Sequence, residues 1–180
     1  MSQILLCCGA SAALHKGVDL ASKLTQAGHR VRAVLTPSAA KLISPQLFEA
    51  VTSEPASVVE LGSERRGAMD HIELSTWAEA VLVAPATADL ISRMALGLAG
   101  DLVTTTLLAI PGGVPRMVCP AMNPNMLANP AVGRNLGTLR EDGWRVLDAE
   151  SGHMACGVDG QGRLPEVEVI VDEVASWLGG

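Results

Sequence analysis

The chain has 180 residues, a hydrophobic fraction of 48% and a formal net charge of −6. These values predict one domain over residues 1–180 with its own core, rather than a disordered chain. The acidic balance, without a block of Lys and Arg, argues against a nucleic-acid surface, and no apolar run reaches the roughly 20 residues of a membrane helix. The first residues lack the basic start of a signal peptide, so we expect a cytoplasmic protein.

Apolar runs and helical patterns alternate along the chain. The runs predict strands at 3–8, 30–35, 80–84, 114–119 and 144–147. Helices are expected at about 13–28, 45–52, 88–97, 102–109, 131–143 and 166–178, with another after His71 and one N-capped by Ser38. Residues 53–70 are expected to be a surface loop. This alternation predicts an α/β fold, a three-layer, Rossmann-like or flavodoxin-like, mostly parallel sheet with helices on both faces.

Four of the predicted strands end in distinctive loops, at 9–12, 36–38, 85–89 and 120–123. In a parallel sheet these loops meet at one edge, where open α/β folds bind ligands. The small-residue turn at 9–12 precedes a helix whose N-terminus could hold a phosphate, although an ordinary strand-to-helix turn is the alternative. The turn matches neither the G-x-G-x-x-G fingerprint nor a P-loop.

Two polar side chains are candidates for chemistry. Asn123 follows an apolar run and lies between Pro120 and Pro124, where its carboxamide could grip a carboxylate or an amide. Asn-Pro is also common turn chemistry, so a simple turn is the alternative. His71 could shuttle a proton near neutral pH, whereas a lone histidine more often caps a helix or packs.

The four cysteines divide into two groups. Cys7, Cys8 and Cys119 lie in apolar runs and are expected to be small buried hydrophobes. No pair has the spacing of zinc ligands, so no metal site is expected. Cys156 lies among glycines in residues 151–163, a segment that we expect to be a flexible flap carrying one thiol and the guanidinium of Arg163.

Motifs spread over nearly the whole chain carry a family resemblance. They are His71-Ile72-Glu73-Leu74, Ala84-Pro85-Ala86-Thr87-Ala88-Asp89, Pro120-Ala121-Met122-Asn123 and Ala155-Cys156-Gly157. Together they resemble the flavin-dependent cysteine decarboxylases, and within that family most of all the phosphopantothenoylcysteine decarboxylases of coenzyme A synthesis. The chain departs from the family at Asp89, where Asn is frequent, and at Gly100, where Asp or Asn is frequent.

The resemblance implies FMN as the cofactor. The residues that it assigns to FMN are Gly9, Ala10, Ser11, Ser38, Thr87, Ala88, Asp89 and Met122. Gly9, Ser11 and Ser38 would lie near the phosphate, and Thr87, Ala88 and Met122 near the ring. It also implies that His71 is an acid/base residue near the flavin, often across a subunit boundary in a homotrimer or a higher assembly of trimers.

The resemblance further implies how the substrate is bound. Asn123 would grip its cysteine carboxylate, and Cys156 would supply a proton late in the reaction. The substrate-binding residues that it assigns are Asn123, Ala155, Cys156, Gly157 and Arg163. Arg163 and Lys41 are the two candidates for binding the phosphate of the substrate.

The implied reaction converts 4′-phospho-N-pantothenoylcysteine to 4′-phosphopantetheine. FMN oxidises the thiol to a thioaldehyde, CO2 leaves, and the reduced flavin and Cys156 return a hydride and a proton to the enethiolate. The cycle is redox-neutral, and a ligase partner or fused domain would supply the substrate. The alternatives are a peptidyl-cysteine oxidative decarboxylase of peptide natural-product maturation, a non-catalytic flavin-binding regulatory protein and a flavin prenyltransferase. The presence of Cys156 favours the coenzyme A pathway.

Overall fold

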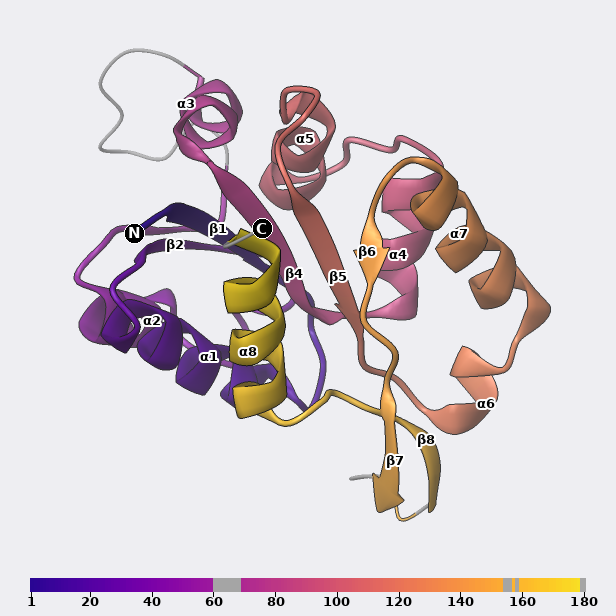
Figure 1. Cartoon of the computed structure of the whole chain (residues 1–180). Helices are drawn as coiled ribbons and strands as arrows, with labels where there is room; N and C mark the ends of the chain where they lie inside the picture. Colours follow the sequence, from indigo (N-terminus) through magenta and orange to yellow (C-terminus); the bar gives the residue numbers. More distant parts are fainter. Residues whose placement is uncertain (60–68, 154–156, 158, 179–180) are drawn as a thin grey trace.

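A parallel sheet of six strands forms the centre of the molecule (Figure 1). The computed structural model describes residues 1–59, 69–153, 157 and 159–178. The strands are β1 (Gln3–Cys8), β2 (Arg30–Leu35), β3 (Ala56–Ser57), β4 (Ala80–Ala86), β5 (Arg116–Pro120) and β6 (Arg145–Val146). Their order is β3-β2-β1-β4-β5-β6, and every neighbouring pair is parallel. The strand order reverses between β1 and β4, which makes this a doubly wound, Rossmann-like sheet.

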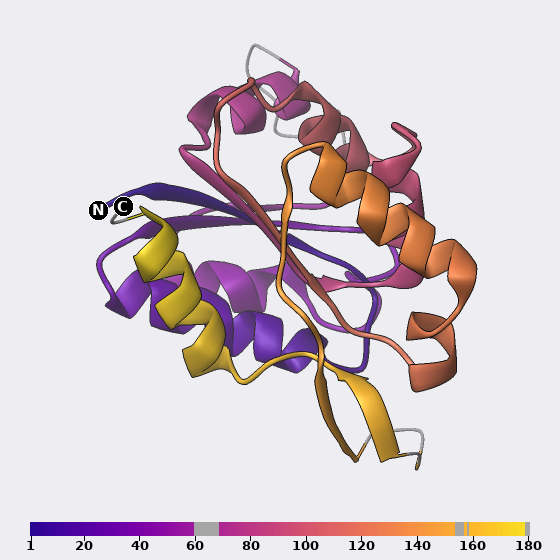
Figure 2. The same cartoon turned by 45° about the vertical axis from the view of Figure 1, so that its right-hand side comes forward.

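Helices cover both faces of the sheet, as Figures 1 and 2 show. One face carries α1 (Leu14–Gln26), α2 (Pro45–Thr52) and α8 (Val167–Leu178), and the other carries α3 (Asp70–Trp77), α4 (Ala88–Ala95), α5 (Leu102–Ala109) and α7 (Pro130–Glu141). Alternate residues of β1 divide between the two resulting core layers. Ile4, Leu6 and Cys8 join the α1 side, whereas Leu5 and Cys7 join the other. The predicted three-layer α/β architecture is confirmed.

The junction between β1 and α1 depends on close backbone packing at the point where the strand order reverses. A Cβ atom on Gly9 would lie 3.1 Å from the Pro85 carbonyl oxygen and 3.2 Å from Thr87 Cγ2. The Gly9 N–H also donates to the Pro85 carbonyl oxygen at 2.9 Å. A side chain at this position would therefore push apart the chain segments that leave β1 and β4.

The segment expected to be a flexible flap contains two strands that the sequence analysis missed. β7 (Glu150–His153) and β8 (Asp159–Arg163) form an antiparallel hairpin, with Gly152 opposite Gly160. Residues 154–156 and 158 lie outside the described residues, so the hairpin is described on either side of them. Its glycines and polar residues give no alternating apolar pattern, which is why the strands could not be predicted.

The hairpin is held against the end of β5. The Met122 N–H donates to the Gly162 carbonyl oxygen at 3.0 Å. A Cβ atom on Gly160 would lie only 2.8 Å from Cγ of Pro124, the first residue of the short helix α6 (Pro124–Leu127). Figures 1 and 2 show β7 and β8 below the sheet, beside α6.

Several local predictions need correction. Ser38 does not cap a helix, because turns follow it and α2 begins only at Pro45; the hydroxyl of Thr36 accepts the local hydrogen bond, from the Ala39 N–H at 3.2 Å. The loop expected at 53–70 contains the short strand β3, and α6 was not expected. Of the helices in the described part of the chain, none is long and apolar enough to cross a membrane.

Candidate functional site

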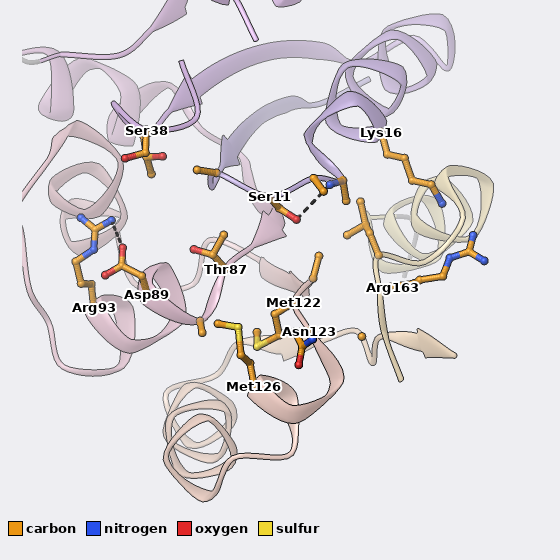
Figure 3. A pocket seen from close by; sticks show the side chains of 18 of the residues that line it. Ser11, Lys16, Ser38, Thr87, Asp89, Arg93, Met122, Asn123, Met126 and Arg163 are labelled. Atoms are coloured by element: carbon orange, nitrogen blue, oxygen red, sulfur yellow. Dashed lines mark hydrogen bonds and ion pairs between the residues drawn. The ribbon is translucent and has the colours of Figure 1, made fainter. Parts of the chain in front are cut away.

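A cavity of about 1030 Å³ opens at the carboxyl ends of the strands, where β1 and β4 meet (Figure 3). Residues 10–13, 36–38, 87–89 and 121–123 line it, so the four predicted loops do converge. Small-molecule sites commonly occupy roughly 300–1,000 Å³. This cavity is slightly larger than that range, which leaves room for a cofactor together with a substrate.

The start of α1 forms one wall of the cavity. Its N-cap is Ala13, which has no side chain able to accept a hydrogen bond, and no acidic residue lies in its first turn. The Ser11 hydroxyl accepts from the Ala13 N–H at 3.2 Å. A helix start without a capping side chain presents backbone N–H groups and the positive end of the helix dipole, which together favour a phosphate.

Another part of the wall is apolar and comes from the segments that follow β4 and β5. Ala88, Met122 and Met126 line it, and Met122 is buried. Thr87 fixes the start of α4, because its hydroxyl accepts from the Leu90 N–H at 3.3 Å. Such a surface suits a flat aromatic ring better than a charged group.

Asn123 lines the cavity at the carboxyl end of β5, as predicted. Its side-chain oxygen N-caps α6 by accepting from the Asn125 N–H at 2.8 Å. The predicted turn is therefore confirmed, and the cap fixes the orientation of the carboxamide on the cavity wall. The amide nitrogen is the group of this side chain that can donate to a carboxylate.

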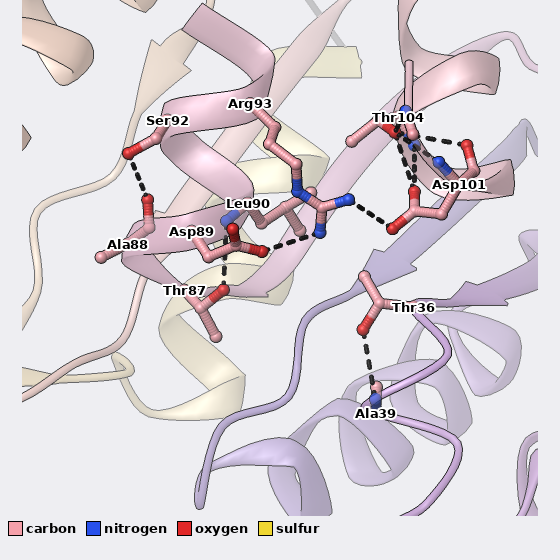
Figure 4. A network of polar contacts seen from close by, with 11 residues as sticks. Thr36, Ala39, Thr87, Ala88, Asp89, Leu90, Ser92, Arg93, Asp101 and Thr104 are labelled. Carbon is pink, nitrogen blue, oxygen red and sulfur yellow. Dashed lines mark hydrogen bonds and ion pairs between the residues drawn. The ribbon is translucent and has the colours of Figure 1, made fainter. Parts of the chain in front are cut away.

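An arginine that the sequence analysis missed lies at one end of the cavity. Arg93 of α4 contacts Asp89 at 2.8 Å and Asp101 at 2.6 Å (Figure 4). Burial alone would raise the pKa of Asp101, but hydrogen bonds from Thr104 and Arg93 outweigh it and hold that pKa below its usual value. The spacing of Asp89 and Arg93, four residues apart on a helix, was the available signal.

A second group of charges lies at the other end. Lys16 of α1 and Arg163 of β8 both line the cavity, and both contact Glu166. Arg163 was predicted from the resemblance, whereas Lys16 was missed. Lys41, the other candidate for the substrate phosphate, is exposed and does not line the cavity.

Other predicted site residues are not brought to this cavity within one chain. His71 lies in the first turn of α3 and does not line the cavity. Gly9 and Gly157 do not line it either. Ala155 and Cys156 lie outside the described residues.

The other three thiols are structural. Cys7, Cys8 and Cys119 are buried in β1 and β5. Burial raises the pKa of Cys119 to about 12 and also raises the pKa values of Cys7 and Cys8. Because the thiolate is the reactive form, these cysteines are unsuited to chemistry, as the sequence predicted.

Comparison with known proteins identifies the family. The family model described as Flavoprotein matches residues 1–179. The chain belongs to the flavoprotein family. It is 40% identical over 168 residues to the coenzyme A biosynthesis bifunctional protein CoaBC of Bacillus subtilis, covering 93% of this chain and 41% of that protein. It is 41% identical over 170 residues to CoaBC of Escherichia coli, covering 94% of this chain and 41% of that protein. The chain thus spans about two fifths of these curated relatives.

Solved structures share the fold of this flavoprotein. A PPC decarboxylase carrying a cysteine-to-serine mutation, in complex with pantothenoylaminoethenethiol, aligns with a TM-score of 0.86 and 28% identity, covering 99% of both chains. The FMN-dependent cysteine decarboxylase SpaF aligns with a TM-score of 0.82 and 28% identity, covering 99% of this chain and 98% of SpaF.

Proposed function

We propose that this flavoprotein decarboxylates 4′-phospho-N-pantothenoylcysteine to 4′-phosphopantetheine in coenzyme A synthesis. The observation that carries the proposal is the position of Asn123, whose carboxamide is fixed by a helix cap on the wall of the cavity. The curated relatives are named for coenzyme A biosynthesis, and the aligned PPC decarboxylase binds an enethiol. A cytoplasmic location, and a ligase partner or fused domain that supplies the substrate, belong to the same proposal.

The cavity fits FMN. Ser11, Ala10 and the uncapped start of α1 would hold the phosphate, with Ser38 nearby on the same wall. Thr87, Ala88 and Met122 would hold the flat ring, and Asp89, through its contact with Arg93, would fix the start of α4. When bound, FMN supplies a two-electron oxidation of the substrate thiol and the return of those electrons after CO2 has left.

The residues of the chain would bind and orient the substrate. Asn123 would donate a hydrogen bond to the cysteine carboxylate and hold it in place until the C–C bond breaks. Met122 and Met126 would keep water from that region. The thiol of Cys156 would give a proton to the carbon of the enethiolate, and an ordinary cysteine pKa near 8.5 is suited to that step.

His71 requires a further element in the proposal, because it does not line the cavity of its own chain. We propose that the protein forms a homotrimer, or a higher assembly of trimers, in which α3 of one subunit brings His71 to the cavity of its neighbour. A cyclic trimer is built from heterologous contacts, in which two different surfaces of neighbouring subunits meet, so α3 of one subunit can face the cavity of the next.

The test is a mass balance on the purified holoprotein with 4′-phospho-N-pantothenoylcysteine and no added reductant. Equal amounts of CO2 and saturated 4′-phosphopantetheine are expected, because the cycle is redox-neutral. An oxidised enethiol product from the wild-type protein would instead favour the peptidyl-cysteine type of reaction. A bound flavin without any CO2 would favour the non-catalytic alternative.

The variant Cys156→Ser separates the two halves of the reaction. We expect it to release CO2 and to form the enethiol together with an equal amount of reduced FMN, because a serine hydroxyl is too weak an acid for the proton transfer that precedes return of the electrons. The enethiol is detected by its ultraviolet absorbance and by mass spectrometry. A normal yield of saturated product from this variant would rule out the role of Cys156. The variant Cys119→Ser is the matched control, since that thiol is buried in β5.

A further inference from the structure

Two cations from opposite ends of the chain meet at one end of the cavity. Lys16 Nζ lies 2.9 Å from Glu166 Oε2, and Arg163 Nη2 lies 2.6 Å from Glu166 Oε1. Figure 3 shows Lys16 and Arg163 extending toward each other from α1 and β8. Both side chains line the cavity, and that of Lys16 is only 20% exposed.

The position of Arg163 is fixed by its neighbours on the hairpin. A Cβ atom on Gly152 would lie 2.8 Å from both Cδ and Nη1 of Arg163. The arginine side chain therefore lies directly over the backbone of β7, in space that is free because Gly152 has no side chain. The contact with Glu166 holds the guanidinium from the other side, so the cation is oriented before any ligand binds.

The charged residues that line the cavity differ between its two ends. Lys16 and Arg163 are both cations, whereas Arg93 at the other end meets the two carboxylates of Asp89 and Asp101. The hydrogen bond from Lys16 lowers the pKa of Glu166, so the carboxylate stays ionised and keeps both cations together at neutral pH. A ligand with an anionic group is therefore attracted to the Lys16 and Arg163 end.

We propose that Lys16 and Arg163 bind the terminal phosphomonoester of the substrate, an inference that rests on the proposed function. The start of α1 takes the cofactor phosphate and Asn123 takes the substrate carboxylate, so a substrate with a second anionic end needs a further cationic site. Arginine matches phosphate oxygens with two parallel N–H donors, and lysine adds a mobile point charge. These two residues then select a phosphorylated small molecule over a peptide.

The experiment compares kcat/KM for 4′-phosphopantothenoylcysteine and for unphosphorylated pantothenoylcysteine, using the FMN-loaded protein. In Lys16→Gln and in Arg163→Gln, the preference for the phosphorylated substrate is expected to fall roughly tenfold to a hundredfold, the effect of one charge-assisted hydrogen bond. The fall should come from a higher KM, because both cations contact a part of the substrate remote from the reacting carbon.

The matched control is Lys23→Gln. Lys23 lies two turns further along α1 and contacts Asp19 and Glu168. It therefore joins α1 to α8, whereas Lys16 joins α1 to the residue just before α8, and Lys23 does not line the cavity. The control should keep the wild-type preference. A preference unchanged in Lys16→Gln and Arg163→Gln would overturn the inference while the function stands.

The dissociation constant of FMN supplies a second readout. If kcat/KM falls equally for both substrates in both variants, and FMN binds more weakly, the cations serve the cofactor and the inference is wrong. Wild-type protein that releases no CO2 from either substrate would overturn the proposed function, and the inference would fall with it.

Discussion

Asn123 shows how one side chain can serve the fold and the site together. Its oxygen caps α6, and its position at the end of β5 places the carboxamide on the cavity wall. Asn129 makes the same kind of cap for α7, accepting from the Ala131 N–H at 2.9 Å, but does not line the cavity. The local pattern Asn-Pro is thus the same at both positions, and only the surroundings differ.

Replacing each of the two asparagines by aspartate separates the capping role from the binding role. Aspartate caps a helix as well as asparagine does, so Asn123→Asp should fold and bind FMN normally. It should lower kcat/KM for CO2 release by at least about a hundredfold, because a carboxylate cannot donate to the substrate carboxylate and repels it. Asn129→Asp should keep wild-type turnover. Thermal unfolding checks that both variants are as stable as the wild-type protein. An equal loss of kcat/KM in the two variants would contradict the role of Asn123.

At the scale of elements, the hairpin of β7 and β8 depends on contacts rather than on strand propensity. Its pairs are formed by polar residues and by Gly152 with Gly160, and it is held at the end of β5 by the hydrogen bond from the Met122 N–H to the Gly162 carbonyl oxygen. The close approach of Gly160 to Pro124 fixes its distance from α6. The hairpin carries Arg163 to the cavity, so its position matters for the substrate.

The variant Gly160→Ala tests this contact. Its new Cβ atom would lie 2.8 Å from Pro124 Cγ, so the hairpin must move away from α6. We expect kcat/KM to fall by up to about a hundredfold, the cost of a displacement of ~1 Å in a bound substrate, with FMN affinity unchanged.

The matched control is Gly133→Ala in α7, where an added Cβ meets nothing within 4 Å. Alanine favours the helix over glycine, so this control should raise the free energy of unfolding by about 0.5–1 kcal/mol and leave turnover unchanged. Full activity in Gly160→Ala would show that the close contact with Pro124 is not needed for function.

For the whole molecule, the cavity forms because a doubly wound sheet brings the loops after β1, β2, β4 and β5 to one place. His71 is not part of that arrangement within one chain, since it lies on α3 and does not line the cavity. The proposed trimer therefore makes a prediction that no single-chain site makes.

Two inactive variants should restore activity when their subunits are mixed. His71→Asn and Asn123→Asp each damage one half of a shared site. In a cyclic trimer assembled from equal amounts of both, about a quarter of the sites would combine an intact His71 with an intact Asn123. Co-expression should recover CO2 release to that extent, whereas mixing after assembly should recover none. No recovery in co-expressed trimers would mean that His71 does not act across a subunit boundary.

The sequence alone determined the layers of the fold and much of the site. Buried apolar strands alternating with amphipathic helices fix a parallel α/β sheet, and the end of each strand then specifies which loops meet. Ser11 and Asn123 were singled out in this way and Thr87 and Met122 by the family resemblance, and all four line the cavity. Only the tertiary structure revealed the hairpin, Lys16 and Arg93. Glycine-rich strands carry no hydrophobic period, and a charged residue becomes part of a site only when distant segments fold against it.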